Sequence, residues 1–320
     1  MAKNVTEDTL ASFANETENV QTIETIPMKV KSHKMSNKEY DEAMEEKRQA
    51  GDMPYLGWQK LDIDALPSMG KFYPNDTKIF VRSATGGEIK HWSTIVPDNL
   101  QSIDAAMNYV IERCCKISIP GIEYMGGNWK DLIDVDRLYI LFAIRDLTFI
   151  KGENELKFPV SETKTIPILK DNIDFIQLPE SIMKYYDADE RCFVLKFKSG
   201  RVVNMYLTSL GVADWIKKYI ATKEQSREQI DKDFIQYAPL LIKSHRKFST
   251  RAYEMLVEES NNWSPEVWAA LSYFKDVLTS GSEPIFKYID ETGVEQTAPL
   301  TFLGGIKSIL SFSDPLSGLM

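Results

Sequence analysis

The sequence predicts an α+β protein with a helical core, short antiparallel β-hairpins and a flexible N-terminal arm. Three observations lead to this prediction. Apolar residues recur at helical spacing in several segments, and turn residues separate two pairs of short β-rich runs. Helices and strands are grouped along the chain instead of alternating as in βαβ units. We expect an arm over residues 1–54, an α+β domain over 55–160, and an α+β region with two hairpins and a helical segment over 161–320.

The arm differs from the rest of the chain in composition. Residues 1–27 are rich in Thr, Glu and Asn, and they offer too little apolar surface to offset the entropy of ordering. Further along, Ser36 and Glu39 match a capping box for a helix over residues 36–48. Because that helix has only a small apolar stripe, we expect it to be ordered only against a partner.

The folded body opens with a predicted structural turn. Its sequence is Leu66-Pro67-Ser68-Met69-Gly70-Lys71-Phe72-Tyr73-Pro74. Pro67 and Pro74 restrict their own φ and the residues before them, while Gly70 can take the positive φ that a sharp reversal needs. Together with Tyr73, these residues define the turn, and residues 79–82 predict a strand after it.

Two helices are predicted next. Apolar residues recur at helical spacing over residues 99–115, with Asp98 as the expected N-cap. Before this helix, Gly86-Gly87 is predicted to form a turn and His91 to lie in a loop. Residues 129–147 predict a second helix, which is apolar on most of its circumference and therefore central.

Charged residues gather at the start and along one side of this central helix. Asp131, Asp134 and Asp136 lack the spacing of a calcium loop, so we expect them to cap the helix start, where its dipole favours carboxylates. Arg137 and Arg145 lie eight residues apart, so both can lie on one face and meet carboxylates from neighbouring segments. Asp136, Arg137 and Arg145 are the predicted ion-pairing residues, and both structural pairing and partner binding stay open.

Two hairpins and four helices complete the predicted fold. The runs 192–197 and 201–207 flank Lys198-Ser199-Gly200, and the runs 284–289 and 294–302 flank Glu291-Thr292-Gly293. Between the hairpins, helices are predicted over residues 213–221, 231–241, 250–259 and 265–278. Ser264 followed by Pro265 marks the start of the last helix.

Composition and charge exclude several classes of function. The net charge of −9 argues against a protein that coats nucleic acid, because such proteins need concentrated Lys and Arg, so we expect protein partners. The basic cluster over residues 243–251 is interpreted as a solvated helix face or a contact for an acidic protein. No secretory signal and no run of eighteen apolar residues is present, so no membrane span is expected. Cys114, Cys115 and Cys192 form no Cys-x-x-Cys pair, which favours a reducing compartment.

Catalytic and ligand-binding patterns are poor. His33, His91 and His245 show no spacing of a metal site or of a base beside a nucleophile. Gly86-Gly87 and Gly126-Gly127 lack the sequence context of a phosphate-binding loop. We therefore expect no enzymatic activity, no bound metal and no cofactor.

The turn block and the central helix resemble a known family. The chain resembles, in the order and spacing of three segments, the baseplate hub subunit family of contractile-tailed phages of the T-even type. These segments are residues 66–74, the strand after them, and Asp136-Arg137-Leu138-Tyr139-Ile140-Leu141-Phe142-Ala143-Ile144-Arg145. The resemblance covers residues 56–158 and, more loosely, 297–302. Many relatives carry a cysteine pair that looks like a zinc knuckle, whereas residues 151–166 contain no cysteine, so no metal is carried over. The arm and an extra helical region also make this chain longer than typical members.

The resemblance implies a non-enzymatic structural component of a phage tail baseplate, as a hub or hub-proximal subunit. Such a protein is expected in the virion, is assembled in the host cytoplasm, and acts through contacts with other tail proteins. One alternative is an assembly chaperone that leaves before maturation. Another is a cell-wall hydrolase, which needs a paired-carboxylate or metal cleft that the sequence does not display. Exposed aromatics are expected to join the arm at the contact surface, and we expect one of Trp58, Trp92 and Trp263 to be interfacial.

Overall fold

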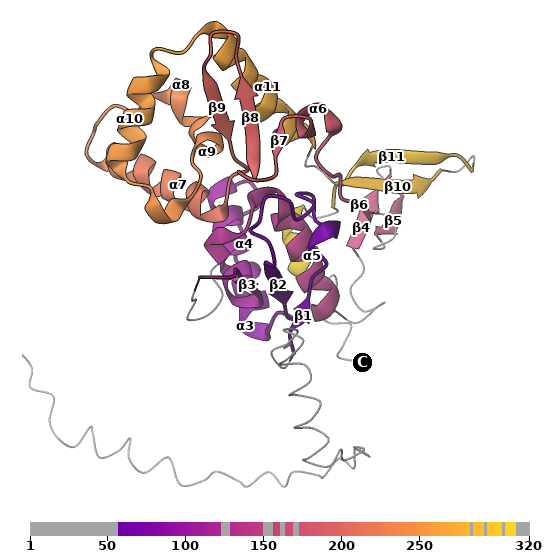
Figure 1. Cartoon of the computed structure of the whole chain (residues 1–320). Coiled ribbons are helices and arrows are strands. Elements are labelled where there is room, and N and C mark those ends of the chain that lie inside the picture. Colours follow the sequence, from indigo (N-terminus) through magenta and orange to yellow (C-terminus); the bar gives the residue numbers. More distant parts are fainter. Residues whose placement is uncertain are drawn as a thin grey trace, which may run out of the picture. The chain divides into compact units, whose positions relative to one another are not determined.

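The computed structural model describes residues 57–122, 129–149, 156–160, 164–168, 173–281, 284–290, 293–302 and 305–311, all within one unit, Pro54–Met320. They form an α+β fold in which helices pack with small antiparallel sheets, as predicted (Figure 1). The arm over residues 1–54, its helix over 36–48 and Gly126-Gly127 lie outside the described residues. No described helix is both long and apolar enough to cross a membrane.

A three-stranded antiparallel sheet begins the described fold. Its strands, in the order β1-β2-β3, are β1 (Gln59–Lys60), β2 (Lys78–Val81) and β3 (Cys115–Ser118). The predicted strand over residues 79–82 is confirmed to within one residue, and Ile79 pairs with Ile117. The sequence did not predict β3, because the strand follows the last helical residue without a turn. Cys114 ends the helix, and Cys115, with φ −128°, already has extended backbone.

The helices α3 (Gly86–Trp92) and α4 (Leu100–Cys114) lie between β2 and β3 in the chain. The prediction of a turn at Gly86-Gly87 is wrong, because these residues open α3, and His91 lies in that helix instead of a loop. Thr85 and Glu88 form a capping box at its start, which offsets the low helix propensity of glycine. In α4, Asn99 takes the N-cap position predicted for Asp98, and its side chain accepts a hydrogen bond of 3.0 Å from Ser102 N.

The predicted helix over residues 129–147 is interrupted. The 3-10 turns η2 (Trp129–Asp131) and η3 (Asp134–Asp136) precede the regular helix α5 (Arg137–Thr148). Backbone groups of Leu132 and Asp134, where η2 ends and η3 begins, bond to a distant segment instead of to the helix. Asp134 N donates to Thr208 O at 2.8 Å, and Leu210 N donates to Leu132 O at 2.8 Å.

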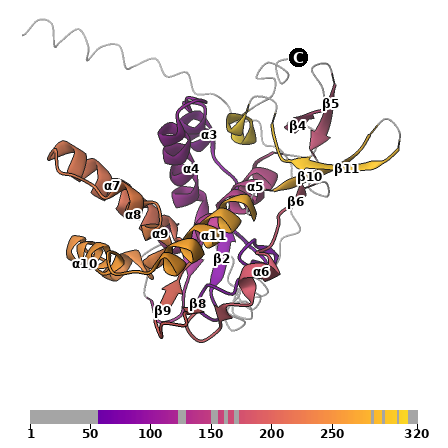
Figure 2. The same ribbon diagram turned by 90° about the horizontal axis from the view of Figure 1, so that it is seen from above.

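The largest group of helices follows in the second half of the chain (Figures 1 and 2). Its elements are α6 (Glu180–Met183), α7 (Leu210–Gln225), α8 (Lys232–Ile235), α9 (Ala238–Leu241), α10 (Thr250–Ser260) and α11 (Pro265–Gly281). They pack with the sheet of β7 (Tyr186–Asp187), β8 (Cys192–Lys196) and β9 (Val202–Met205). The hairpin of β8 and β9 is confirmed, with Gly200 at φ +84° in its turn. The predicted helix over 231–241 divides into α8 and α9, because Pro239 starts a new helix.

Two further hairpins lie beside one another. The predicted one consists of β10 (Ile285–Ile289) and β11 (Glu295–Pro299), which extend away from the helices with β6 (Ile173–Asp174) on the other edge of β10 (Figures 1 and 2). The other consists of β4 (Leu156–Pro159) and β5 (Thr165–Ile168), which the sequence did not predict. Phe158 of β4 packs on Phe286 of β10, with ring centroids 4.4 Å apart.

One continuous core joins the regions predicted as 55–160 and 161–320. The 3-10 turn η6 (Ile306–Leu310) is part of it, with Ile309 and Leu310 fully buried. Trp92 Nε1 donates a hydrogen bond of 2.8 Å to Lys307 O, so this turn near the end of the described chain packs against α3.

Candidate functional site

The turn block has the conformation that its sequence predicts. Gly70 has φ +67°, and the reversal is closed by hydrogen bonds from Met69 N to Leu66 O and from Tyr73 N to Gly70 O. A Cβ on Gly70 would lie 3.2 Å from both the side chain and the carbonyl of Ile63, so the site is restricted by space as well as by φ.

The turn block and the start of the central helix meet at one buried carboxylate, that of Asp136. Ser68 N and Ser68 Oγ donate to it at 2.8 and 2.7 Å, and Tyr73 OH donates at 2.8 Å. The Tyr73 hydroxyl in turn accepts a hydrogen bond of 3.0 Å from Ile133 N. Burial raises the pKa of Asp136 to about 6, although the three hydrogen bonds favour the ionised form. We call this arrangement the Asp136 junction.

Asp136 takes the N-cap position of α5, at the helix start as predicted, but its side chain makes no capping hydrogen bond to that helix. Its oxygens are taken by the turn block, so it contacts hydroxyl and amide donors where an ion pair was predicted. Ser68 and Tyr73 lie more than sixty residues before Asp136 in the sequence, so no local sequence pattern predicts their contact. The donors of Ser68 and Tyr73 reduce the free-energy cost of burying the Asp136 carboxylate without removing it.

Arg137 meets a carboxylate, as predicted. Its guanidinium donates to Asp104 Oδ1 at 2.6 Å and to Asp104 O at 2.8 Å, which fastens α5 to α4. Lys217 of α7 bonds to the same carboxylate, so three helices are linked there. Burial tends to raise the pKa of Asp104, but Arg137 and Lys217 outweigh it and hold the pKa below its usual value.

Arg145 contacts the other end of the chain. Its guanidinium donates to the carbonyl oxygens of Ile309 and Ser308 in η6, and it lies over the ring of Phe149. Burial lowers the pKa of Arg145 to about 10. The role of this side chain is thus to hold η6 against α5, since guanidinium groups provide several donors for neighbouring carbonyls.

Two of the three candidate interface tryptophans are in the core. Trp92 has no exposed surface and Trp263 keeps 9%, so neither is available as a surface aromatic. Trp58 is half-buried, and the cations of Lys116 and Arg82 lie over its ring at 4.5 and 5.6 Å from the centroid.

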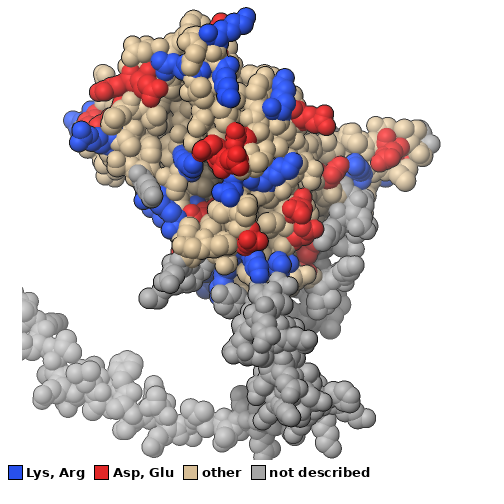
Figure 3. All heavy atoms as spheres, viewed as in Figure 1, with Lys and Arg blue, Asp and Glu red and all other residues tan. Residues whose placement is uncertain are grey.

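The basic cluster over residues 243–251 is not an open cationic patch. Arg246 pairs with Asp131, and Lys243 Nζ lies 3.1 Å from Glu190 Oε2. On the face shown in Figure 3, Lys and Arg lie beside Asp and Glu, without a large area of one sign. Among the described residues, no group of three or more His, Cys, Asp or Glu side chains could hold a metal ion.

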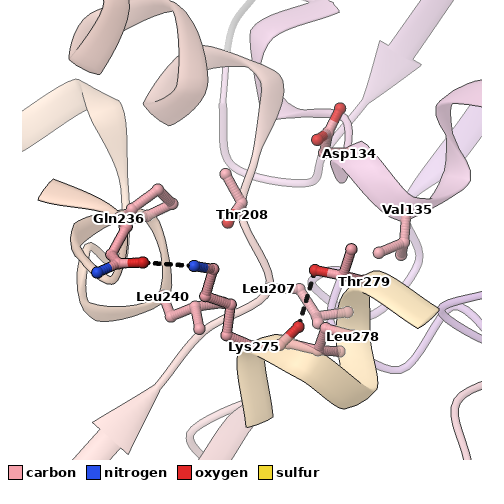
Figure 4. A pocket seen from close by; sticks show the side chains of 10 residues that line it. Asp134, Val135, Leu207, Thr208, Gln236, Leu240, Lys275, Leu278 and Thr279 are labelled. Carbon is pink, nitrogen blue, oxygen red and sulfur yellow. Dashed lines mark hydrogen bonds between the residues drawn. The ribbon is translucent and has the colours of Figure 1, made fainter. Parts of the chain in front are cut away.

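A pocket of about 360 Å³ lies where η3, the segment before α7, α9 and α11 come together (Figure 4). Apolar side chains such as Leu240 and Leu278 line it together with Asp134, Gln236 and Lys275. Lys275 Nζ is directed to Gln236, with 2.6 Å between Nζ and Oε1, and away from the Asp134 carboxylate (Figure 4). The ten residues that line this pocket include no Ser, Cys or His, and the hydroxyl of Thr279 donates to the carbonyl oxygen of Lys275.

A second hollow, of about 970 Å³, separates α4 from α7, and we call it the α4/α7 groove. Its walls carry Leu100, Ile103 and Met107 from α4 and Ile220 from α7, with Trp129 of η2 between them. The two helices are connected across it by the ion pair of Lys217 with Asp104. This groove is the candidate functional site, because it combines a concave shape with the exposed side chain of Leu100 and the half-buried side chains beside it.

Sequence reasoning did not single out this groove, although a signal was present. The apolar stripe of the predicted helix over residues 99–115 is wider than one core-facing side needs. Ala106, Val110 and Ile111 are buried, whereas Leu100 is 81% exposed. The excess width of the stripe marks a second apolar face.

Comparisons of the chain with family models, curated proteins and solved structures find no match.

Proposed function

We propose that this chain is a non-enzymatic structural component of a phage tail baseplate, a hub or hub-proximal subunit that acts through protein contacts. The proposal rests on the resemblance of the turn block and the central helix to the hub subunit family. The Asp136 junction supports it, because Ser68 and Tyr73 of one block bond directly to Asp136 of the other. Two sequence blocks that resemble one family in order and spacing are thus parts of a single structural unit.

The position of these residues also fits a structural role. Ser68, Tyr73 and Asp136 are buried, so these side chains stabilise the fold. A partner protein would bind to other residues, which lie at the surface. The α4/α7 groove is the surface that we assign to recognition, because it is concave and carries Leu100, an exposed apolar side chain. On this proposal the protein is located in the virion baseplate, is assembled in the host cytoplasm, and has other tail proteins as partners.

The composition of purified particles tests the proposal. We expect quantitative mass spectrometry to find the protein in intact virions and in isolated baseplates, at one fixed ratio to the other baseplate proteins. Presence in assembly intermediates but absence from virions would favour the assembly chaperone instead. A lytic band on a peptidoglycan zymogram of the purified protein would favour the cell-wall hydrolase.

A further inference from the structure

Another hollow, of about 210 Å³, lies beside the central helix, and we call it the α5 pocket. Its other walls come from the first sheet, from the β4/β5 hairpin and from the segment that starts at β6. The wall on α5 is one face of that helix, because its residues recur at spacings of three or four. They include Tyr139, Phe142, Ala143 and Leu147.

Core residues form much of the α5 pocket. Val81 has no exposed surface, and Phe142 and Leu156 are buried as well. Because packing already fixes these side chains, a ligand does not have to order them, and that cost is not subtracted from its free energy of binding. Sites for small molecules are typically of this kind, mostly apolar and largely formed before the ligand arrives.

Three aromatic rings line the pocket together. Phe175 meets Tyr139 and Phe142 edge to face, with ring centroids 5.0 and 5.7 Å apart. In such contacts the positive edge of one ring lies against the negative face of another. A further ring beside these three can make the same contact, whereas an aliphatic group cannot. The lining therefore favours an aromatic guest over an aliphatic one of equal size.

The volume of the pocket suits a single ring. An apolar protein cavity of about 150 Å³, lined by Leu, Ile and Phe, stays dry and binds benzene. The α5 pocket measures about 210 Å³ and has side chains of the same kinds, so it has room for one ring with a small substituent. Such a guest supplies the dispersion contacts that the lining lacks where it faces empty space.

The polar residues of the lining favour an uncharged guest. The Arg145 guanidinium is bound to carbonyl oxygens of η6, and the Asp146 side chain is exposed to water. A charged guest would lose its hydration in the apolar part of the pocket, at a high cost in free energy. Gln59 is exposed and thus lies at the mouth, where its amide offers both donors and an acceptor to a hydroxyl group.

We propose that the α5 pocket binds a small uncharged aromatic molecule, a single ring whose polar substituent points to the mouth. This goes beyond the proposed function, because it assigns a ligand site within the folded body that contacts between proteins do not require. The size and chemistry of the pocket carry the inference, so it is independent of the baseplate assignment.

Phenol is the probe, and saturation-transfer NMR of the ligand follows its titration against the full chain. We expect saturable binding with a dissociation constant on the order of 0.1–1 mM, as is reasonable for a ligand of so few atoms. Cyclohexanol has nearly the same size and the same hydroxyl without the aromatic ring, and benzoate carries a charge. Each should bind about fivefold more weakly than phenol, or not at all.

A variant that fills the pocket locates the binding site. Ala143→Leu places three more carbon atoms in the pocket and should weaken phenol binding by about tenfold or more, because the guest then has no room. Ala269→Leu is the matched control. Ala269 is exposed on α11 and does not line the pocket, so this variant should bind phenol like the wild type. Circular dichroism melting shows whether both variants retain the fold.

A second measurement needs no variant. In wild-type protein with isotope-labelled isoleucine methyl groups, the ring current of bound phenol should shift the signals of Ile168 and Ile173, which line the pocket. The signal of Ile242, which is buried elsewhere in the core, should stay in place. Absence of saturable phenol binding, equal binding of cyclohexanol, full binding by folded Ala143→Leu, or shifts only at isoleucines outside the pocket would each overturn the inference.

Discussion

Tyr73 and Asp136 are joined by a buried hydrogen bond of 2.8 Å from the phenol to the carboxylate. The same phenol oxygen accepts from Ile133 N at 3.0 Å, so it both donates and accepts inside the protein. Through this one oxygen, the turn block, the segment before α5 and the helix start are fixed together. Burial and the nearby Asp136 carboxylate raise the pKa of Tyr73, which therefore remains a proton donor.

Tyr73→Phe is expected to lower the free energy of unfolding by about 1–3 kcal/mol, because Ile133 N and Asp136 lose a buried partner at the same time. Urea denaturation monitored by tryptophan fluorescence measures the change. The control is Tyr273→Phe, since Tyr273 is 48% exposed and its loss of a hydroxyl should change stability little. Equal stabilities of the two variants would contradict the Asp136 junction.

Asp136 is expected to make stability depend on pH between about 4 and 6. Its folded-state pKa of about 6 lies above that of an unfolded aspartate, so in this window the folded state binds more protons than the unfolded state. Stability should therefore fall as pH rises, by an amount on the order of 3 kcal/mol, and level off above about pH 7. Subtracting the unfolding free energy of Asp136→Asn from that of the wild type isolates this effect. A difference that stays constant from pH 4 to 8 would refute it.

Gly70→Val is expected to destabilise the protein by about 1–3 kcal/mol or more, since Gly70 has φ +67° and little room for a side chain. Gly57→Val separates the two causes. Gly57 has φ +80°, and apart from its chain neighbours no atom of the described residues lies within 4 Å of the position that a Cβ would take there, so its variant tests backbone strain without such a contact. Thermal unfolding should place Gly70→Val below Gly57→Val. The opposite order would show that Ile63 moves aside without cost.

Two glycines at helix starts should respond to alanine in opposite directions. Gly87→Ala in α3 is expected to stabilise by about 0.5–1 kcal/mol, because the nearest atom to its Cβ lies at 3.8 Å and alanine favours the helix. Gly211→Ala in α7 is expected to destabilise, because its Cβ would collide with the imidazole ring of His245. Differential scanning calorimetry of both variants gives the signs. A stabilising Gly211→Ala would mean that His245 has another position open to it.

The sequence predicted those elements whose signals are local. The hairpin of β8 and β9 follows from a Gly-containing turn between β-rich runs, and the start of α11 follows from Ser264 before Pro265. It failed where distant backbone groups compete with the local preference. The predicted helix over residues 129–147 is broken because Asp134 N bonds to Thr208 O, a partner that no window of sequence contains.

The same distinction applies to the candidate site residues. The positive φ of Gly70 could be predicted, since it depends on the residue and its neighbours alone. The partners of Asp136 and Arg145 could not, because they come from segments that lie far away along the chain. For the tryptophans, composition indicates only that some must be buried. It does not indicate that Trp92 and Trp263 are the ones.

The contacts of η6 have a consequence for the order in which the protein is made. Lys307 O accepts from Trp92, and Ile309 O accepts from Arg145, so α3 and α5 receive these partners only when the chain has been synthesised as far as residue 309. At ~5–20 residues per second, the ribosome needs roughly 10–40 s to add the intervening residues. During that time the Trp92 indole N–H and the Arg145 guanidinium lack the carbonyl acceptors that η6 later provides. The part of the core around α3 and α5, which is synthesised early, is therefore completed only when η6 has been made.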